Sequence, residues 1–249
     1  MFKPVFLVSL LVLFFSVSAF CKLPKPKVLI MTKTAGFHHA SIPKGVAAIE
    51  KLGANNGFDV DVTNDSLVFT NNNLRQYAAV IFLSTTGTLF NEAQRNALKD
   101  YIHSGGGFVG VHAATDTEYG WPWYNKLVGA YFANHPRQQV ARLLIKNRRH
   151  ISTKHLPKVW ERKDEWYNFK DISNDIKVLI TIDEESYEGG KNGNNHPMAW
   201  YHTFEGGRVF YTALGHTDES YQEPMFLKHL LGGIQYAMGT KPAKKTKLK

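Results

Sequence analysis

The alternation of short apolar runs with helical segments is the feature that most constrains the fold of this chain. In the first half, two of the apolar runs are followed by segments with helical spacing. Ser41 and Asn91 begin these helices, Pro43 stands in the first turn of the earlier one, and Gly53 and Gly105 end them. Such an order predicts a parallel sheet with helices on both faces. Strands are expected at residues 27–31, 58–62, 79–83 and 108–111.

The second half is richer in strands, which are expected at residues 139–146, 177–182, 198–204 and 208–213. Gly206-Gly207 would join the last two as a hairpin, and residues 222–238 would close the fold as a helix. With 249 residues, 43% of them hydrophobic, the chain can bury a large core and is too apolar to be disordered. No composition change marks a second domain, so we expect one α/β domain over residues 27–238. Its sheet should be mostly parallel with added antiparallel strands.

Residues 1–20 have the pattern of a secretory signal peptide. Lys3 supplies a positive charge, residues 5–17 are almost wholly apolar, and Val17-Ser18-Ala19 resembles a cleavage site. The alternative is a membrane anchor, although the stretch is short for a spanning helix. We therefore expect an exported protein, periplasmic or extracellular, with residues 21–26 as a linker. Cys21 leaves lipid attachment open. As the only cysteine, it excludes an intramolecular disulfide and a cysteine nucleophile within the domain.

The formal net charge of +9 comes mostly from the two ends of the chain. Lys3 and the five lysines of the tail, residues 239–249, supply six positive charges, which leaves about +3 for the folded part. The tail has no interleaved aromatic residues, so we expect no nucleic-acid partner. No later segment is long and apolar enough to predict a stable membrane span. The oligomeric state stays open.

Histidine is the most informative residue type, because several of the eleven histidines follow predicted strands. His38-His39 follow the strand at 27–31, His112 ends the strand at 108–111, and His216 follows the strand at 208–213. The carboxyl ends of parallel strands form one edge of a sheet, where ligands bind. A lone histidine is more often structural, but three at one edge favour a shared site. We therefore expect His38, His112 and His216 to line one pocket.

Acidic residues accompany these histidines and can orient an imidazole, raise its pKa or share a metal with it. Asp116 follows His112, and Asp164-Glu165 stands beside Trp166-Tyr167. Asp218-Glu219 follows His216, where either acid could instead cap a helix. Aromatic residues gather in the same loops, where they could bind the apolar faces of sugar rings or fill the core: Tyr119, Trp121, Trp123, Tyr124, Trp166, Tyr167, Trp200 and Tyr201.

One motif is set aside. Gly105, Gly107 and Gly110 match the dinucleotide-binding fingerprint by their spacing. That fingerprint must follow a strand and open a helix, whereas these glycines end a predicted helix and enter a strand. We interpret them as a helix end and a tight turn.

Five ordered segments resemble the ThuA-like (trehalose utilisation) family, and the resemblance covers about residues 27–238. The segments are Lys33–Ile42, Gly105–Asp116, Asp164–Phe169, His196–Trp200 and Gly207–His216. The resemblance implies a class I glutamine amidotransferase-like fold, a flavodoxin-like three-layer sandwich. In that fold the nucleophile stands on a strained turn between strand and helix, and here His112 occupies the position of the amidotransferase cysteine. His216 matches the catalytic histidine. Because an imidazole cannot form the thioester, glutamine amidotransferase activity is not expected.

The resemblance also implies sugar catabolism, notably of trehalose and its 3-keto derivatives. We expect an enzyme that acts on such a carbohydrate by histidine acid–base or metal-assisted chemistry, as a hydrolase, lyase or isomerase. The predicted catalytic residues are His112, His216, Asp116 and Glu165. The predicted substrate-binding residues are His38, Tyr167, His196, Trp200 and Trp123. A divalent metal ion would be held by His112, His216 and His38.

Two alternatives stay open. The chain could be a carbohydrate-binding protein without catalysis, since it lacks the ancestral cysteine. It could also be a conventional glycoside hydrolase with Asp116 and Glu165 as paired carboxylates.

Overall fold

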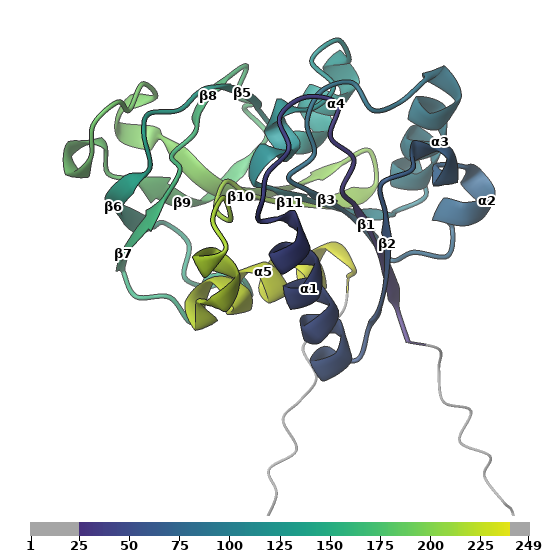
Figure 1. The fold of residues 1–249 in the computed structure, drawn as a ribbon, viewed down its shortest axis with the longest axis horizontal. Coiled ribbons are helices and arrows are strands. Elements are labelled where there is room, and N and C mark those ends of the chain that lie inside the picture. The colour runs from purple at the N-terminus through teal and green to yellow at the C-terminus, as the bar shows by residue number, and fades with distance from the viewer. Residues whose placement is uncertain (1–24, 240–249) are drawn as a thin grey trace, which may run out of the picture.

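A computed structural model describes residues 25–239. The predicted signal peptide, Cys21 and the tail beyond Gly239 lie outside the described residues. Nine strands form one mixed sheet through the middle of the molecule, in the order β2-β1-β3-β4-β11-β10-β9-β6-β7 (Figure 1). The domain is therefore α/β with one continuous sheet, as predicted.

Five neighbouring strands of this sheet are parallel: β2 (Asp59–Thr63), β1 (Lys27–Met31), β3 (Ala79–Leu83), β4 (Gly107–Val111) and β11 (Gly207–Thr212). The register pairs Ile30 with Ile81, Ile81 with Val109, and Val109 with Phe210. Every residue of β3 and β4 is buried, because helices cover both faces. The order of the five strands is that of flavodoxin-like sheets, which bind ligands at the carboxyl edge.

The other four strands extend the sheet in antiparallel fashion: β10 (Pro197–Phe204), β9 (Lys177–Ile182), β6 (Gln139–Ile145) and β7 (Val159–Asp164). Since the direction reverses at each step, β9 and β7 again run parallel to β11. The carboxyl end of β7 therefore lies at the same edge as those of the five parallel strands. A two-residue turn, Glu205-Gly206, joins β10 to β11, and both residues have positive φ, 46° and 100°.

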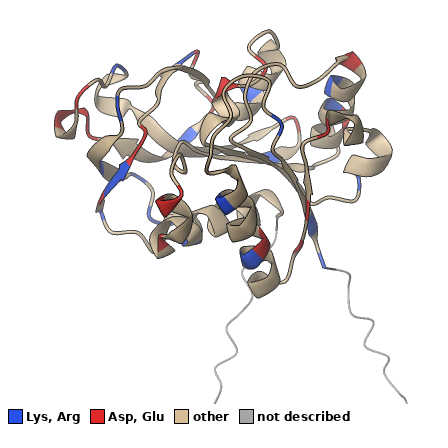
Figure 2. Ribbon diagram, in the orientation of Figure 1, with Lys and Arg blue, Asp and Glu red and all other residues tan. Residues whose placement is uncertain are grey.

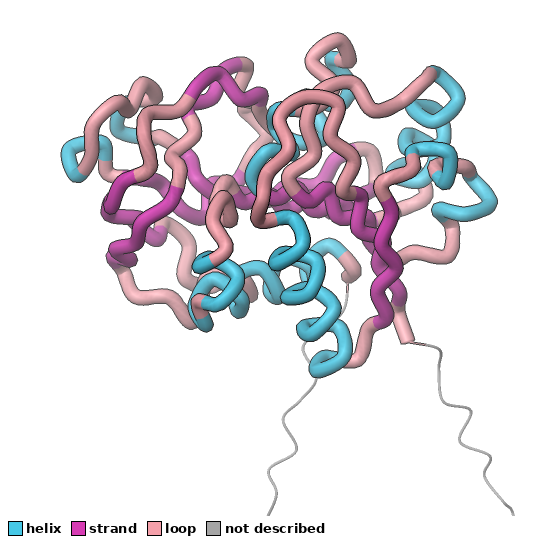
Figure 3. Tube along the Cα trace, in the orientation of Figure 1, coloured by secondary structure: helices cyan, strands magenta, loops and turns pink. Residues whose placement is uncertain are grey.

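Helices lie on both faces of the sheet and make three layers (Figure 1). One face carries α1 (Ile42–Asn56) and α5 (Pro224–Ala237), and the other carries α2 (Asn71–Leu74), α3 (Glu92–His103) and α4 (Pro122–Val128). Figure 3 shows the same layers by element type, with strands through the middle and helices above and below. A separate ribbon pairs β5 (Tyr131–Asn134) with β8 (Asn168–Lys170).

The strands and longer helices predicted from the sequence are present, with ends that differ by at most three residues. The largest difference is in α1, which continues past the predicted end at Gly53 to Asn56. Asn91 caps α3 as expected, through a capping box with Gln94. Strand β7 was not predicted. Its residues alternate between exposed and buried, and a charged residue, Arg162, holds one of the inward positions. Charge at an inward position hides the apolar alternation that marks a half-buried strand.

The glycines set aside above have structural roles. Gly105 follows α3 with a φ of 93°, and Gly107 begins β4. A Cβ atom at Gly107 would come within 2.3 Å of the Ala237 carbonyl oxygen in α5, so the side chain of any other residue would push the helix away.

Charged residues of both signs are interspersed around the periphery, and the central strands carry few of them (Figure 2). Among residues 25–239, no helix combines the length and the apolar character needed to cross a membrane.

Candidate active site

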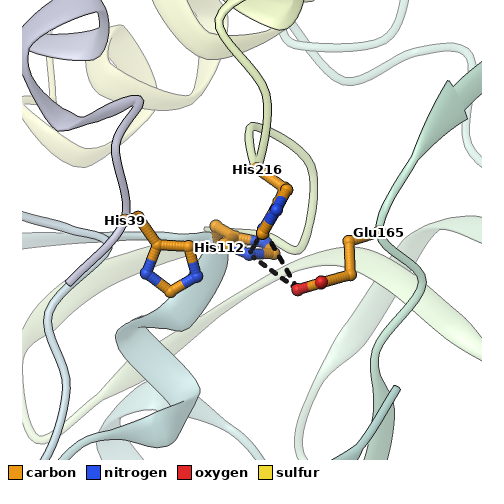
Figure 4. A group of neighbouring side chains, drawn as sticks. All are labelled: His39, His112, Glu165 and His216. Atoms are coloured by element: carbon orange, nitrogen blue, oxygen red, sulfur yellow. Dashed lines mark hydrogen bonds and ion pairs between the residues drawn. The ribbon is translucent and has the colours of Figure 1, made fainter. Parts of the chain in front are cut away.

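Four side chains meet at the carboxyl edge of the sheet (Figure 4). Three follow the ends of strands β4, β7 and β11, and the fourth lies in the loop between β1 and α1. One ligand atom from each lies within 4.8 Å of those of the other three. We call this group the histidine–glutamate cluster, which consists of His39, His112, Glu165 and His216.

His112 stands on a strained turn directly after β4. Its φ is 50°, a left-handed conformation that is uncommon outside glycine, and a short 3-10 helix begins at this residue. The position is thus a sharp strand-to-helix turn, as expected from the fold. The Nδ1–H of His112 donates to the Ala213 carbonyl oxygen at 2.8 Å. This hydrogen bond fixes the tautomer and leaves Nε2 as the atom that faces the cluster.

His216 and Glu165 complete the centre of the cluster. The Nδ1 atom of His216 lies 3.0 Å from His112 Nε2 and 3.1 Å from Glu165 Oε2. Glu165 Oε2 lies 3.5 Å from His112 Nε2. Because His112 carries its proton on Nδ1, the proton on His216 Nδ1 is the one shared with the other two atoms. Two imidazoles and one carboxylate therefore meet at a single point.

Asp164, the last residue of β7, fixes the backbone on both sides of this point. Its Oδ1 accepts hydrogen bonds from the backbone N–H groups of Glu165 (2.9 Å) and His216 (3.2 Å). Its Oδ2 accepts from Gly215 N at 3.0 Å and pairs with Arg162 Nη2 at 3.1 Å. Asp164 is fully buried. It ties the end of β7 to the loop after β11, although it does not face the pocket itself.

Burial and the neighbouring charges set the pKa values of the cluster. Burial alone would raise the pKa of Glu165, but its close contacts with the imidazoles of His112 and His216 outweigh it and hold that pKa far below its usual range. Burial would lower the pKa of His216, yet the hydrogen bond and charge of Glu165 raise it overall. Burial, followed by repulsion from His112 and His216, lowers the pKa of His39 to about 3. The cluster thus contains a carboxylate and a neutral His39 at neutral pH.

A pocket of about 340 Å³ opens above the cluster, at the small end of the range for small-molecule sites. Three aromatic rings, three histidines and two acids line this pocket, which we call the edge pocket: Phe37, Phe132, Tyr167, His39, His135, His216, Asp116 and Glu165. The ring of Tyr167 lies 4.3 Å from the rings of both His112 and Phe132, centroid to centroid. Apolar ring faces beside hydrogen-bonding groups suit a sugar.

Asp116 is a second carboxylate of the edge pocket, separate from the cluster. Burial raises its pKa above the usual range, against the effect of a hydrogen bond from the Tyr119 hydroxyl at 2.7 Å. Among the described residues, Asp116 is bonded to Tyr119, whereas His112 and His216 bond to each other and, in the case of His112, to Ala213. A carboxylate with a raised pKa is a better proton acceptor than an ordinary one.

Four of the residues predicted to bind substrate are placed elsewhere. His38 is exposed, where its Nδ1 contacts Thr34 Oγ1 at 3.2 Å, and its neighbour His39 takes the expected place in the cluster. Trp200 is fully buried in a central strand and donates to the Val128 carbonyl oxygen.

His196 is also fully buried, and it links Glu184 to the Tyr167 carbonyl oxygen at 2.7 Å each. Trp123 packs on Trp121 and donates to Glu205 in the turn between β10 and β11. Only Tyr167 of the predicted substrate-binding set lines the edge pocket. The predicted catalytic residues His112, His216, Asp116 and Glu165 do come together at this edge.

Sequence reasoning missed His39, Asp164, His135 and the rings of Phe37 and Phe132. His39 stands next to the chosen His38, and only the path of the loop decides which imidazole turns inward. His135 Nδ1 lies 3.3 Å from Glu165 Oε1, which places a further imidazole at the rim. Its position before a proline, which restricts the backbone, was the one signal for it.

The chain is similar to a known protein family and to several solved structures. The profile of the ThuA family, described as trehalose utilisation, matches residues 27–237. No curated protein sequence matches the chain. A ThuA-like protein of Bacteroides uniformis is 24% identical, with a TM-score of 0.73 over 89% of this chain and 94% of that one. A ThuA-like protein of Parabacteroides merdae is 21% identical, with a TM-score of 0.73 over 90% and 94%.

The likeness extends to the amidotransferase-like fold. PurLQS of Thermotoga maritima is 11% identical, with a TM-score of 0.52 over 86% of this chain and 97% of the other. At this identity the likeness concerns the fold alone. It agrees with a flavodoxin-like three-layer architecture in which His112 follows the fourth parallel strand.

Proposed function

Because this chain belongs to the ThuA (trehalose utilisation) family, we propose that it is an enzyme that processes a sugar, acting on trehalose-like glycosides or their 3-keto derivatives. The observation that carries this proposal is the edge pocket, where aromatic rings surround the histidine–glutamate cluster and the separate carboxylate of Asp116. The rings would hold the sugar, and the polar groups would act on it.

A 3-keto sugar suits these groups because the hydrogen atoms beside its carbonyl are acidic. Asp116 would take the proton from C2, and the electron pair would move to the carbonyl oxygen as an enolate. The histidine–glutamate cluster would stabilise the negative oxygen through a protonated imidazole. The enolate then re-forms the carbonyl, the C1–C2 double bond forms, and the glycosidic C1–O bond breaks. The leaving oxygen recovers the proton from Asp116, so the step is an elimination.

The alternative of a conventional glycoside hydrolase is weakened by the contacts of Glu165. Both Asp116 and Glu165 line the edge pocket, as paired carboxylates would. However, Oε2 of Glu165 contacts His112 and His216, and Oε1 contacts His135. A carboxylate engaged on both oxygens is poorly placed to attack a sugar carbon.

The proposal is tested by incubating the purified protein with trehalose and with its 3-keto form in D2O, followed by proton NMR. We expect deuterium beside the carbonyl, or cleavage, only with the keto sugar and faster than without protein. Asp116→Asn should slow the reaction by about 10²–10⁴-fold. Glu219→Gln, which changes an exposed acid outside the edge pocket, should keep the rate. Binding of the keto sugar with neither exchange nor cleavage would favour a non-catalytic carbohydrate-binding protein.

We also propose that the protein works outside the cytoplasm, on the grounds of the charged and apolar pattern of residues 1–20. Cell fractionation and mass spectrometry of the mature chain test this. A chain that begins after Ala19, or a lipid on Cys21, would support export. An intact Met1 in the cytoplasmic fraction would contradict it.

A further inference from the structure

The histidine–glutamate cluster has more nitrogen and oxygen donors at one point than proton transfer requires. Three imidazoles and one carboxylate converge there from four separate segments (Figure 4). We propose that this cluster is a binding site for one divalent transition-metal ion of the Zn²⁺ class. The site stands on its own geometry, whereas the role of the ion in turnover rests on the proposed function.

The spacing of the inner atoms matches a coordination shell. A tetrahedral ion with bonds of about 2.0–2.1 Å holds its ligand atoms about 3.3–3.4 Å apart. Nε2 of His112, Nδ1 of His216 and Oε2 of Glu165 are separated by 3.0, 3.1 and 3.5 Å. The ligand atom of His39 lies within 4.8 Å of all three, so a small rotation of its ring would complete the shell.

Neighbouring groups hold the cluster residues in place by hydrogen bonds, as neighbouring groups do around the ligands of metal sites. A metal-ligating histidine usually donates its other N–H to a carbonyl or carboxylate, and His112 donates Nδ1–H to the Ala213 carbonyl oxygen. Asp164 holds the backbone N–H groups of both Glu165 and His216. Two ligands from distant parts of the chain are thereby kept in register by one buried carboxylate.

His39 is placed to complete the ligand set. Its side chain is only 3% exposed, and its Nδ1 has no hydrogen-bond partner among the described residues. Its ring meets those of His112 and His216 edge to face, at centroid distances of 4.8 and 5.2 Å. One ring nitrogen of this buried imidazole faces the other members of the cluster (Figure 4), where it would serve as the fourth ligand atom.

The donor set selects the class of ion. Three imidazole nitrogens and one carboxylate oxygen suit Zn²⁺ and its first-row neighbours, whereas Mg²⁺ and Ca²⁺ prefer oxygen ligands. Because three members of the cluster also line the edge pocket, a bound ion would face the substrate. When bound, it would supply a Lewis acid for a carbonyl oxygen.

The test is metal analysis and calorimetry on tag-free protein, first stripped with a chelator and then titrated with Zn²⁺, with Co²⁺ as a spectroscopic probe. We expect about one ion per chain and visible Co²⁺ bands typical of nitrogen ligands. His39→Ala and His216→Ala should weaken binding by roughly 100-fold or more. His38→Ala removes the adjacent exposed histidine and is the matched control, so it should bind like the unchanged protein.

The outcomes separate the two proposals. Tight binding that fails in the cluster variants, without any sugar turnover, would support the site and contradict the proposed function. Absence of a tight ion from the unchanged protein, or equal weakening by His38→Ala, would overturn the metal site.

Discussion

Acid should destabilise this protein through a histidine far from the edge pocket. His229, in α5, is fully buried among the rings of Trp160, Phe210 and Phe226. Burial lowers its pKa from 6.5 to about 3. The Nδ1–H donates to the Ser152 carbonyl oxygen, and Nε2 lies 3.2 Å from the Thr212 hydroxyl, which can donate to it. Both hydrogen bonds suit a neutral ring, and a proton on Nε2 would oppose the second.

The direction and size of this acid effect follow from the pKa of His229 in the unfolded chain and its pKa in the folded protein. The unfolded chain takes up a proton near pH 6.5, whereas the folded protein resists it until about pH 3. His229 therefore leaves the free energy of unfolding unchanged above pH 6.5. Below that pH the unfolded chain binds a proton that the folded protein does not, so the free energy of unfolding falls as the pH drops towards 3. At about 1.4 kcal/mol per pH unit, protonation of His229 in the unfolded chain should lower the free energy of unfolding by roughly 3 kcal/mol at pH 4.5.

Urea denaturation at pH 7.5 and 4.5 measures this loss. In His229→Gln, the difference in unfolding free energy between the two pH values should be smaller than in the unchanged protein by roughly 3 kcal/mol. His38→Gln, which removes an exposed imidazole, is the control and should retain the original difference. If His229→Gln loses as much stability in acid as the unchanged protein, burial of this ring is not a source of acid sensitivity.

Three further predictions concern single side chains. Phe37→Ala should raise KM several-fold and change stability by less than about 0.5 kcal/mol, because this ring lines the edge pocket yet is 66% exposed. Arg95→Met should destabilise the fold by roughly 3–5 kcal/mol in urea, since it removes the positive partner of the buried Glu118 and leaves that carboxylate only two backbone N–H groups; adding Glu118→Gln should restore part of this. Asp164→Asn should lower kcat roughly 10–100-fold with little change in KM, while circular dichroism shows the fold retained.

The parallel half of the fold could be predicted because its strands are buried on both faces. The runs of β1 and β3 are almost entirely apolar, and turn or capping residues flank the helices between them. Strand β7 could not be predicted in this way, since exposed charges alternate with inward positions and Arg162 holds one of these through its pairing with Asp164. The position of Glu165 depends on the direction of β7, which follows from pairings distant in the sequence.

The candidate site was predicted where a residue follows a strand directly, as His112 does. In the loop after β1 the prediction named His38, whereas His39 joins the cluster; His216 also follows a short loop, and it does lie in the cluster. The choice between His38 and His39 depends on how the loop after β1 packs, and no local pattern encodes that. Trp200 was expected to reach the pocket, but it lies within β10, where neighbouring elements cover it. An aromatic residue in a central strand more often packs in the core than binds a ligand.

The histidine–glutamate cluster is proposed to be the reacting centre of a sugar pocket. A crystal structure of Asp116→Asn with the 3-keto form of trehalose tests it most directly, because the variant should bind the sugar without consuming it. We predict the sugar against the rings of Phe132 and Tyr167, with its carbonyl oxygen directed at His112 and His216. A sugar bound elsewhere, or bound with its carbonyl directed away from the cluster, would contradict this account.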